Sequence, residues 1–177
     1  MSSVHVISEE EARNFAFGEA GQLLISFREL GAIGVVDADT EELVWAVKGY
    51  WVLQHDPRIL DNGNLLLFDN GGNYAVPAGR SRVVEFDPAS MRIVWQYAGT
   101  PESPLASDIR SYVQRLGNGN TLITESNGGR ILEVDGNGDI VWEFVNPVRG
   151  GPEGERIPVI CKAQRLDEGI VRFLRGA

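Results

Sequence analysis

The stretch Gly63-Asn64-Leu65-Leu66-Leu67 opens a unit that this chain of 177 residues contains three times. In each copy a glycine and a polar residue precede a mainly apolar run, which is followed by a short stretch ending at an aspartate and then by an apolar-Val-Trp stretch. The copies occupy residues 21–25, 35–37 and 43–45; residues 63–67, 85–87 and 93–95; and residues 119–123, 133–135 and 140–142. From glycine to aspartate the distance is 16, 24 and 16 positions, and from aspartate to tryptophan it is 8, 8 and 7. Such regular spacing indicates a structural repeat.

A repeat of about 40 to 55 residues that carries several short strands is typical of the blades of a β-propeller. We therefore predict an all-β chain that forms a single partial β-propeller domain over residues 1–177. Its four-stranded blades are expected at about residues 4–49, 50–99 and 109–147, with an incomplete fourth blade at 157–177. About three to three and a half blades are fewer than the four or more of a closed ring. We expect oligomerisation, with a homodimer as the preferred form, to complete the ring.

The composition is that of a globular protein, with 43% hydrophobic and 23% charged residues. The 25 acidic side chains against 16 basic ones give a formal net charge of −9, which disfavours nucleic acid and anionic membranes as partners. The first residues lack the basic and apolar regions of a signal peptide, and no run reaches the roughly 18 apolar residues of a membrane span. As written, the sequence predicts a cytoplasmic protein, and a periplasmic or exported one only if an N-terminal part is missing.

Neither a metal ion nor a cofactor is expected. The single cysteine, Cys161, has no neighbouring Cys or His with which to form a metal site, and we predict that it is a small buried hydrophobic residue. The stretch Asp135-Gly136-Asn137-Gly138-Asp139 resembles the start of a calcium loop but lacks the required glycine and distal glutamate, so a hairpin turn is the better interpretation. A propeller that holds a quinone is a further alternative, and the chain lacks the dense ligands such a cofactor needs.

Only two histidines, His5 and His55, are available for acid–base or nucleophilic chemistry. His5 lies in an apolar, strand-like stretch, and we assign it no role. His55 lies in Gln54-His55-Asp56-Pro57-Arg58, where an innermost strand is expected to begin, so its side chain should face the central channel. There an imidazole can act as a nucleophile, a general base or a metal ligand. The alternative is a histidine that is hydrogen-bonded to a neighbouring loop.

Arginines near this histidine suit a tetrahedral oxyanion such as sulfate or phosphate. A glycine-rich stretch at 73–79 leads to Arg80 and Arg82, and a guanidinium can bind two oxygens of such a group at once. Arg28, which follows Ser26 and Phe27, is placed to reach the same channel from the preceding blade. The alternative is that these arginines pair with carboxylates on the surface of an acidic protein.

Three stretches of the chain resemble the arylsulfotransferase (arylsulfate sulfotransferase) family, with similarity from about residue 2 to residue 165. They are Gln54-His55-Asp56-Pro57 through Leu66-Leu67-Phe68-Asp69-Asn70-Gly71, then Ser81-Arg82-Val83-Val84-Glu85-Phe86-Asp87, then Gln114-Arg115-Leu116 through Thr121-Leu122-Ile123-Thr124-Glu125. The combination of His-Asp with Phe-Asp-Asn-Gly is the more specific signal, because the Asn-Gly-Asn-Thr-Leu turn occurs in many propellers. The resemblance implies a six-bladed propeller that moves a sulfuryl group from an aryl sulfate to a phenol through a sulfated histidine, without a nucleotide donor.

The resemblance also implies roles for individual residues. His55 is the expected nucleophile, and Arg28 is expected to stabilise the sulfate oxygens as charge develops on them. We place five further residues among those that bind the substrate: Asp56, Asn70, Arg80, Arg82 and Arg115.

The chain departs from the family where the family has a His-x-Asn-Ser segment before the arginine. The corresponding residues are Met1-Ser2-Ser3-Val4, so that Ser2 stands in place of the asparagine and no residue stands in place of the histidine. The preceding blades are missing too, and the chain therefore resembles the C-terminal part of a family propeller. The alternative function is that of a non-catalytic β-propeller fragment that acts as a binding or oligomerisation module.

Overall fold

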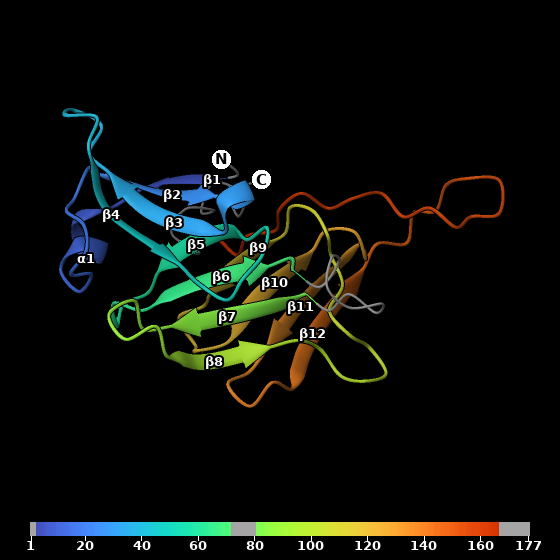
Figure 1. The fold of residues 1–177 in the computed structure, drawn as a ribbon. Coiled ribbons are helices and arrows are strands. Elements are labelled where there is room, and N and C mark those ends of the chain that lie inside the picture. Colours follow the sequence, from blue (N-terminus) through green and yellow to red (C-terminus); the bar gives the residue numbers. More distant parts are fainter. Residues whose placement is uncertain (1–2, 72–80, 167–177) are drawn as a thin grey trace, which may run out of the picture.

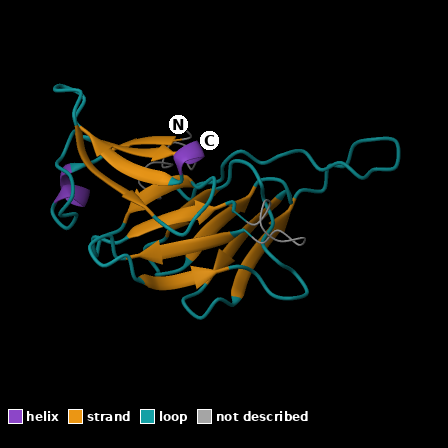
Figure 2. Ribbon diagram, viewed as in Figure 1, coloured by secondary structure: helices purple, strands orange, loops and turns teal. Residues whose placement is uncertain are grey.

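Three four-stranded antiparallel sheets make up the described part of the chain, residues 3–71 and 81–166 of a computed structural model (Figure 1). The sheets contain β1 (Ser3–Val6), β2 (Leu23–Phe27), β3 (Ala32–Val36) and β4 (Leu43–Lys48); β5 (His55–Ile59), β6 (Leu65–Asp69), β7 (Arg82–Phe86) and β8 (Ile93–Tyr97); and β9 (Tyr112–Arg115), β10 (Thr121–Glu125), β11 (Arg130–Val134) and β12 (Ile140–Val145). Figure 2 shows the two short helices, α1 (Glu9–Ala12) and η1 (Arg28–Leu30), at the ends of first-sheet strands. Neither helix is long enough to cross a membrane, and this part of the chain has no other. The prediction of an all-β chain built from four-stranded blades is confirmed.

A tight turn that needs glycine and asparagine joins the first two strands of a blade. In the second sheet the backbone N–H of Leu60 donates to the carbonyl of Asn64 at 2.9 Å, and the side-chain oxygen of Asn62 accepts from the backbone of Asn64 at 3.0 Å. Gly63 has a φ of 80° and Gly119, in the same turn of the third sheet, a φ of 87°. Because this left-handed conformation costs glycine little, the repeated Gly marks the turn in the sequence.

The stretch at 135–139 forms the turn between β11 and β12, as the hairpin interpretation predicted. One carboxylate oxygen of Asp135 accepts hydrogen bonds from the backbone N–H groups of Asn137 and Asp139, both at 2.9 Å. The acidic side chain therefore stabilises the turn.

The core lies between the sheets, and β6 is buried at every position. Leu65 and Leu67 pack in a cluster with residues of the first sheet, whereas Leu66 and Phe68 pack in a second cluster with residues of the third. This division follows from the alternation of side chains along a strand. The second sheet is thus enclosed between its two neighbours, as blades are in a propeller.

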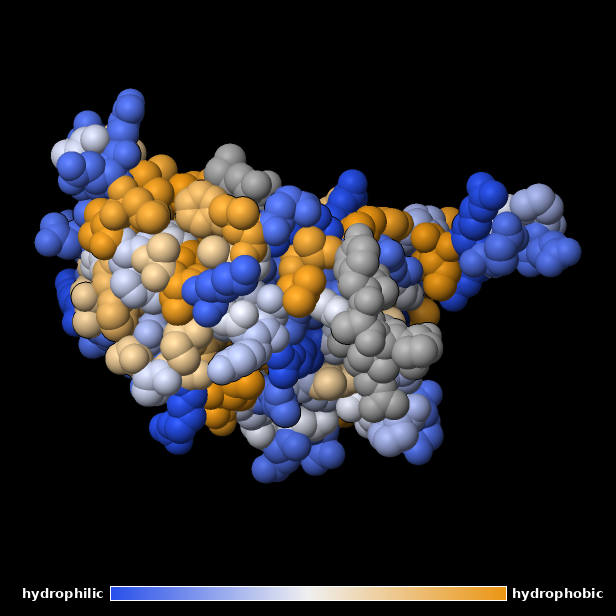
Figure 3. All heavy atoms as spheres, in the orientation of Figure 1, coloured by the Kyte–Doolittle hydropathy of each residue, from blue (hydrophilic) through white to orange (hydrophobic). Residues whose placement is uncertain are grey.

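The outer strands differ from this pattern. The valine of the repeated apolar-Val-Trp stretch is about half exposed in all three sheets, at 50% for Val44, 47% for Val94 and 54% for Val141. In Figure 3 hydrophobic residues are gathered over the first sheet, where Leu43 of β4 is also 58% exposed. The repeated tryptophan, and not the valine before it, is therefore the residue that can pack between blades.

Residues 157–166 run beside the inner strand β9 without forming a strand of their own. Arg165 forms an ion pair with Glu133 at 2.8 Å, which repeats the pair that Arg115 and Glu85 form at 2.7 Å one blade earlier. The segment therefore takes the place of the first strand of a fourth blade. Within the described residues that blade is only partly present.

Candidate active site

His55 is the first residue of β5, and the backbone around it is strained. Leu53 and Asp56 lie in the left-handed region, with φ angles of 57° and 52°. The register between β5 and β6 shifts between His55 and Arg58, which is a β-bulge. Left-handed residues other than glycine cost of order 1–3 kcal/mol each and are common at functional sites, where the surrounding structure holds them.

His55 lines a cavity of about 510 Å³ at which the inner strands of all three sheets begin. Ser3 of β1 and Tyr112 of β9 line the same cavity. Ser3, His55 and Tyr112 occupy equivalent positions in their sheets. Each pairs with the residue of the neighbouring strand that lies five positions after that blade's turn glycine. His55 thus faces the space between the blades, as its place at the start of an inner strand predicted.

The hydrogen bonds of His55 fix its tautomer. Its Nδ1 lies 2.7 Å from the side-chain oxygen of Asn70 and 3.0 Å from the carbonyl oxygen of Leu53. Asn70 is held in this orientation because its Nδ2 donates to the carbonyl of Ser107 at 2.7 Å. Since both partners of Nδ1 are acceptors, Nδ1 carries the hydrogen, and the neutral ring has its lone pair on Nε2. Asn70, which is predicted to bind substrate, is fully buried and is not among the residues that line the cavity, so in this structure it positions His55.

The surroundings keep His55 neutral. Burial lowers the pKa of His55 below its usual value of 6.5, and the positive charge of Arg28 lowers it further. The hydrogen bonds to Asn70 and to the carbonyl of Leu53 oppose the shift without reversing it. At pH 7 the imidazole is therefore unprotonated and its Nε2 is available as a nucleophile.

This shift predicts how a reaction that uses Nε2 depends on pH. We expect kcat/KM to remain constant as the pH is lowered past 6.5. It should decrease only when the pH reaches the lowered pKa of His55, where the imidazole becomes protonated. In an Arg28→Gln variant the neighbouring positive charge is gone, so the pKa of His55 rises and the acidic limb moves to higher pH. Profiles of kcat/KM against pH for the two proteins measure this. An acidic limb that is the same in both, or lower in the variant, would contradict the assignment.

Asp56 is held by an ionic network that crosses from the second sheet to the first. Both of its oxygens accept from Arg58, at 3.1 Å and 2.5 Å. Arg58 also donates to Nδ1 of His5 at 2.9 Å, and Nε2 of His5 lies 2.7 Å from Glu11. Burial raises the pKa of Asp56, and the hydrogen bonds from Arg58 oppose this change. Asp56 is predicted to bind substrate, but its carboxylate is already occupied, and His5 belongs to the network that supports it.

Three cations line the cavity with His55: Arg28, Arg110 and Lys162. Arg28 starts η1 and forms an ion pair with the adjacent Glu29. The sequence analysis missed Arg110 and Lys162. Arg110 precedes Tyr112 by two positions, as Leu53 precedes His55, and the φ angles of Arg110 and Leu53 are 56° and 57°. The position two residues before His55 and before Tyr112 is thus equivalent in the two blades, and this equivalence could have identified Arg110 from the sequence.

Cys161 also lines this cavity, and the prediction that it is buried is wrong. It lies in the segment 157–166, and its side chain is exposed. Its sulfur accepts a hydrogen bond from Arg110 Nη1 at 2.7 Å. Across residues 3–71 and 81–166, no group of three or more His, Cys, Asp or Glu is arranged to hold a metal ion.

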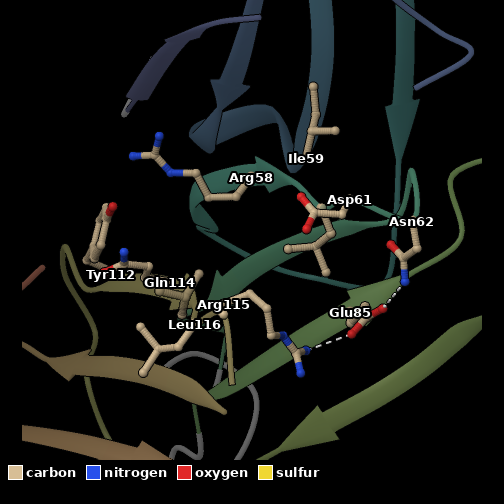
Figure 4. Close-up of a pocket in the computed structure, with 12 residues that line it drawn as sticks. Arg58, Ile59, Asp61, Asn62, Glu85, Tyr112, Gln114, Arg115 and Leu116 are labelled. Atoms are coloured by element: carbon tan, nitrogen blue, oxygen red, sulfur yellow. Dashed lines mark hydrogen bonds and ion pairs between the residues drawn. The ribbon is translucent and has the colours of Figure 1, made fainter. Parts of the chain in front are cut away.

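Of the other predicted arginines, Arg82 and Arg115 do not line the cavity around His55. Arg82 donates to Asp69 at 2.9 Å, and Arg115 pairs with Glu85, in keeping with the alternative that such arginines pair with carboxylates. Figure 4 shows the Arg115–Glu85 pair in a second cavity, of about 410 Å³, near the far ends of the inner strands. Arg80 lies outside the described residues, as does Ser2, which replaces the family's asparagine.

Residues 4–147 match the family model described as "Arylsulfotransferase (ASST)". A comparison with curated proteins found no match. Among solved structures, the WD40 β-propeller domain of Doa1 is similar with a TM-score of 0.55 and 15% identity, over 82% of this chain and 40% of that one. The virginiamycin B lyase of Staphylococcus aureus is similar with a TM-score of 0.49 and 16% identity, over 82% of this chain and 42% of that one. The likeness to the Doa1 domain shows the propeller fold alone, and the chain spans about 40% of the length of either protein.

Proposed function

Because this chain belongs to the arylsulfotransferase family, we propose that it transfers a sulfuryl group from an aryl sulfate to a phenolic acceptor through a sulfated His55. The observation that carries the proposal is the tautomer of His55. Its Nδ1 donates to Asn70 at 2.7 Å, so the lone pair is on Nε2 of a residue that lines the cavity. A neutral imidazole with a free lone pair is what attack on sulfur requires.

The transfer takes place in two steps. In the first, the Nε2 lone pair of His55 attacks sulfur, an Nε2–S bond forms, and the bond from sulfur to the aryl oxygen breaks, so that the phenolate leaves with its electron pair. The Nδ1–H of the sulfated ring remains donated to Asn70. In the second step, the oxygen of the acceptor phenol attacks sulfur, the Nε2–S electron pair returns to the ring, and the phenolic proton passes to solvent. Arg28 stabilises the sulfuryl oxygens in both steps.

A coloured leaving group provides the test. The protein is incubated with p-nitrophenyl sulfate, and release of p-nitrophenolate is followed with and without an acceptor phenol. We expect turnover that depends on the acceptor and double-reciprocal plots with parallel lines, as for a covalent intermediate. Absence of release by a folded sample, or release to water that no phenol accelerates, would contradict the proposal.

We also propose a second function, self-assembly, because the outer face of the third blade is open. Trp45 packs on the core between the first two sheets, and Trp95 donates to the backbone of the third sheet through Gly136 at 3.1 Å. The equivalent Trp142 is 46% exposed and Phe144, two residues on, is 40% exposed. A neighbouring blade covers this position in the first two sheets, so a second copy of the chain would cover it in the third.

The open face of the first blade offers the matching surface. Val4 and Val6 of β1 are 47% and 58% exposed, whereas Ile7 is buried in the core shared with the second blade. With residues 157–166 beside it, the third blade of each copy would pair with the first blade of the other.

We expect the wild-type chain to be a dimer in light scattering coupled to size exclusion. A Trp142→Glu variant should be a monomer, because a charge would then lie in the centre of the apolar contact. Val94→Glu is the matched control, since Val94 lies on the outer strand of the enclosed second blade and is 47% exposed, as Trp142 is 46% exposed. A wild-type monomer, or a dimer that Trp142→Glu leaves intact, would contradict assembly through this face.

A further inference from the structure

We propose that Arg110 and Lys162, which line the His55 cavity, bind the sulfate group of the substrate together with Arg28. The inference rests on the proposed function, because it assigns the groups that recognise the oxyanion in that same site. Neither residue lies in the three stretches quoted for the family resemblance, and the structure brings both to the cavity.

Arg110 donates to the sulfur of Cys161 and Lys162 lies over the ring of Tyr112, but the ion pairs of the cavity involve neither of these two cations. The charged residues that line it are Arg28, Arg110, Lys162, Glu29 and Asp56. Glu29 pairs with Arg28, and Asp56 pairs with Arg58, which does not line this cavity. Within the described residues neither Arg110 nor Lys162 forms an ion pair. In a chain with a net charge of −9, two cations without a carboxylate partner at one cavity favour an anionic ligand.

Arg110 is fixed relative to His55 by the side chain that also orients the histidine. Asn70 accepts from His55 Nδ1, and its Nδ2 lies 3.4 Å from the carbonyl oxygen of Arg110. The backbone continues in a left-handed conformation at Ser111, with a φ of 77°, and exchanges hydrogen bonds of 2.9 Å and 3.3 Å with Ser126. A strained backbone held by buried hydrogen bonds therefore carries Arg110 to the nucleophile.

Lys162 reaches the cavity from the segment that begins the fourth blade. The segment is tied to the third blade by hydrogen bonds from Ala163 to Thr124 at 3.0 Å and from Arg165 to Gln114 at 2.9 Å. The ammonium of Lys162 lies 4.1 Å from the ring centroid of Tyr112, the buried residue that shares the register position of His55. A cation–π contact of this kind holds the charge at the cavity without neutralising it.

Arg28, Arg110 and Lys162 therefore approach the cavity from the first sheet, from the connection before the third sheet and from the segment after it. A tetrahedral sulfuryl group presents its oxygens in different directions, and cations on separate elements can contact different oxygens. The arrangement predicts recognition of the oxyanion itself, and inorganic sulfate should bind even when no reaction takes place.

The test measures binding of inorganic sulfate by calorimetry, in the wild type and in Arg110→Gln, Lys162→Gln and the double variant. We expect each single substitution to weaken binding about three- to tenfold, since each removes one charge-assisted contact. Arg156→Gln is the matched control, because Arg156 is exposed and pairs only with the adjacent Glu155, so that it changes the net charge by the same amount. Circular dichroism confirms that each variant is folded.

The outcomes separate this inference from the proposed function. In a His55→Ala background turnover is lost by design, yet sulfate binding should remain and should still weaken on Arg110→Gln or Lys162→Gln. If the wild type binds no sulfate, or if the two variants bind it as Arg156→Gln does, the inference is overturned whether or not the protein turns over aryl sulfate. If sulfate binding weakens as expected but no turnover occurs, Arg110 and Lys162 bind the oxyanion as proposed and the transferase proposal fails.

Discussion

Replacing His55 by alanine is expected to abolish turnover of an aryl sulfate, with a loss of roughly 10³-fold or more in kcat/KM. The reason is chemical, because the variant lacks the Nε2 lone pair that forms the bond to sulfur. The cations of the cavity remain, so binding of sulfate should change little. Steady-state release of p-nitrophenolate measures the loss.

Two controls make this result specific to His55. His5→Gln removes the other histidine, which pairs with Glu11 and does not line the cavity, and it should retain most of the activity. Free imidazole added to His55→Ala should restore part of the turnover, because it can occupy the space that the side chain leaves. If His55→Ala keeps its activity, the nucleophile is a different group and the proposed mechanism is wrong.

The second large effect is expected at Asn70, which is buried and touches no solvent. Asn70→Leu removes one of the two acceptors of His55 Nδ1–H and one of the two donors to the carbonyl of Ser107, which keeps the hydroxyl of Ser81. We expect the free energy of unfolding to fall by about 1–3 kcal/mol, because buried polar groups lose hydrogen bonds. Activity should fall by roughly 10 to 100-fold, since only the carbonyl of Leu53 then holds the tautomer and orientation of His55.

A conservative variant distinguishes positioning from a merely structural role. Asn70→Asp keeps an acceptor for Nδ1–H but adds a negative charge, which raises the pKa of His55. The acidic limb of kcat/KM should therefore move to higher pH in Asn70→Asp, and denaturant unfolding gives the stability of each variant. A stability loss without any change in the pH profile or in activity would show that Asn70 only supports the fold.

The fold could be predicted from the sequence because its signals are local and repeated. The turn glycines 63 and 119 are required by a left-handed φ, and the apolar runs that follow them are buried on both faces, as in β6.

The candidate site could be predicted only in part. His55 and Arg28 line the same cavity as expected, since His55 begins an inner strand and Arg28 follows the end of β2 in the preceding blade. Arg82 and Arg115 were assigned by residue type, and their long side chains pair instead with Asp69 and Glu85 from neighbouring strands.

The exposure of Cys161 and the approach of Lys162 to the cavity were not inferred from the sequence. Both depend on how the segment 157–166 lies against the third sheet, which is a contact between distant parts of the chain. The predicted incomplete fourth blade gave the position of the segment but not the side chains that it brings to the cavity.

Mass spectrometry tests directly whether His55 becomes sulfated during transfer. The protein is incubated with p-nitrophenyl sulfate in the absence of a phenolic acceptor, and the intact mass is measured before peptides are mapped at neutral to mildly alkaline pH. We expect an added mass of one SO₃ group on the peptide that contains His55, its loss when a phenol is added, and no addition to His55→Ala. Turnover without any adduct, or an adduct on another residue that persists in His55→Ala, would contradict transfer through a sulfated His55.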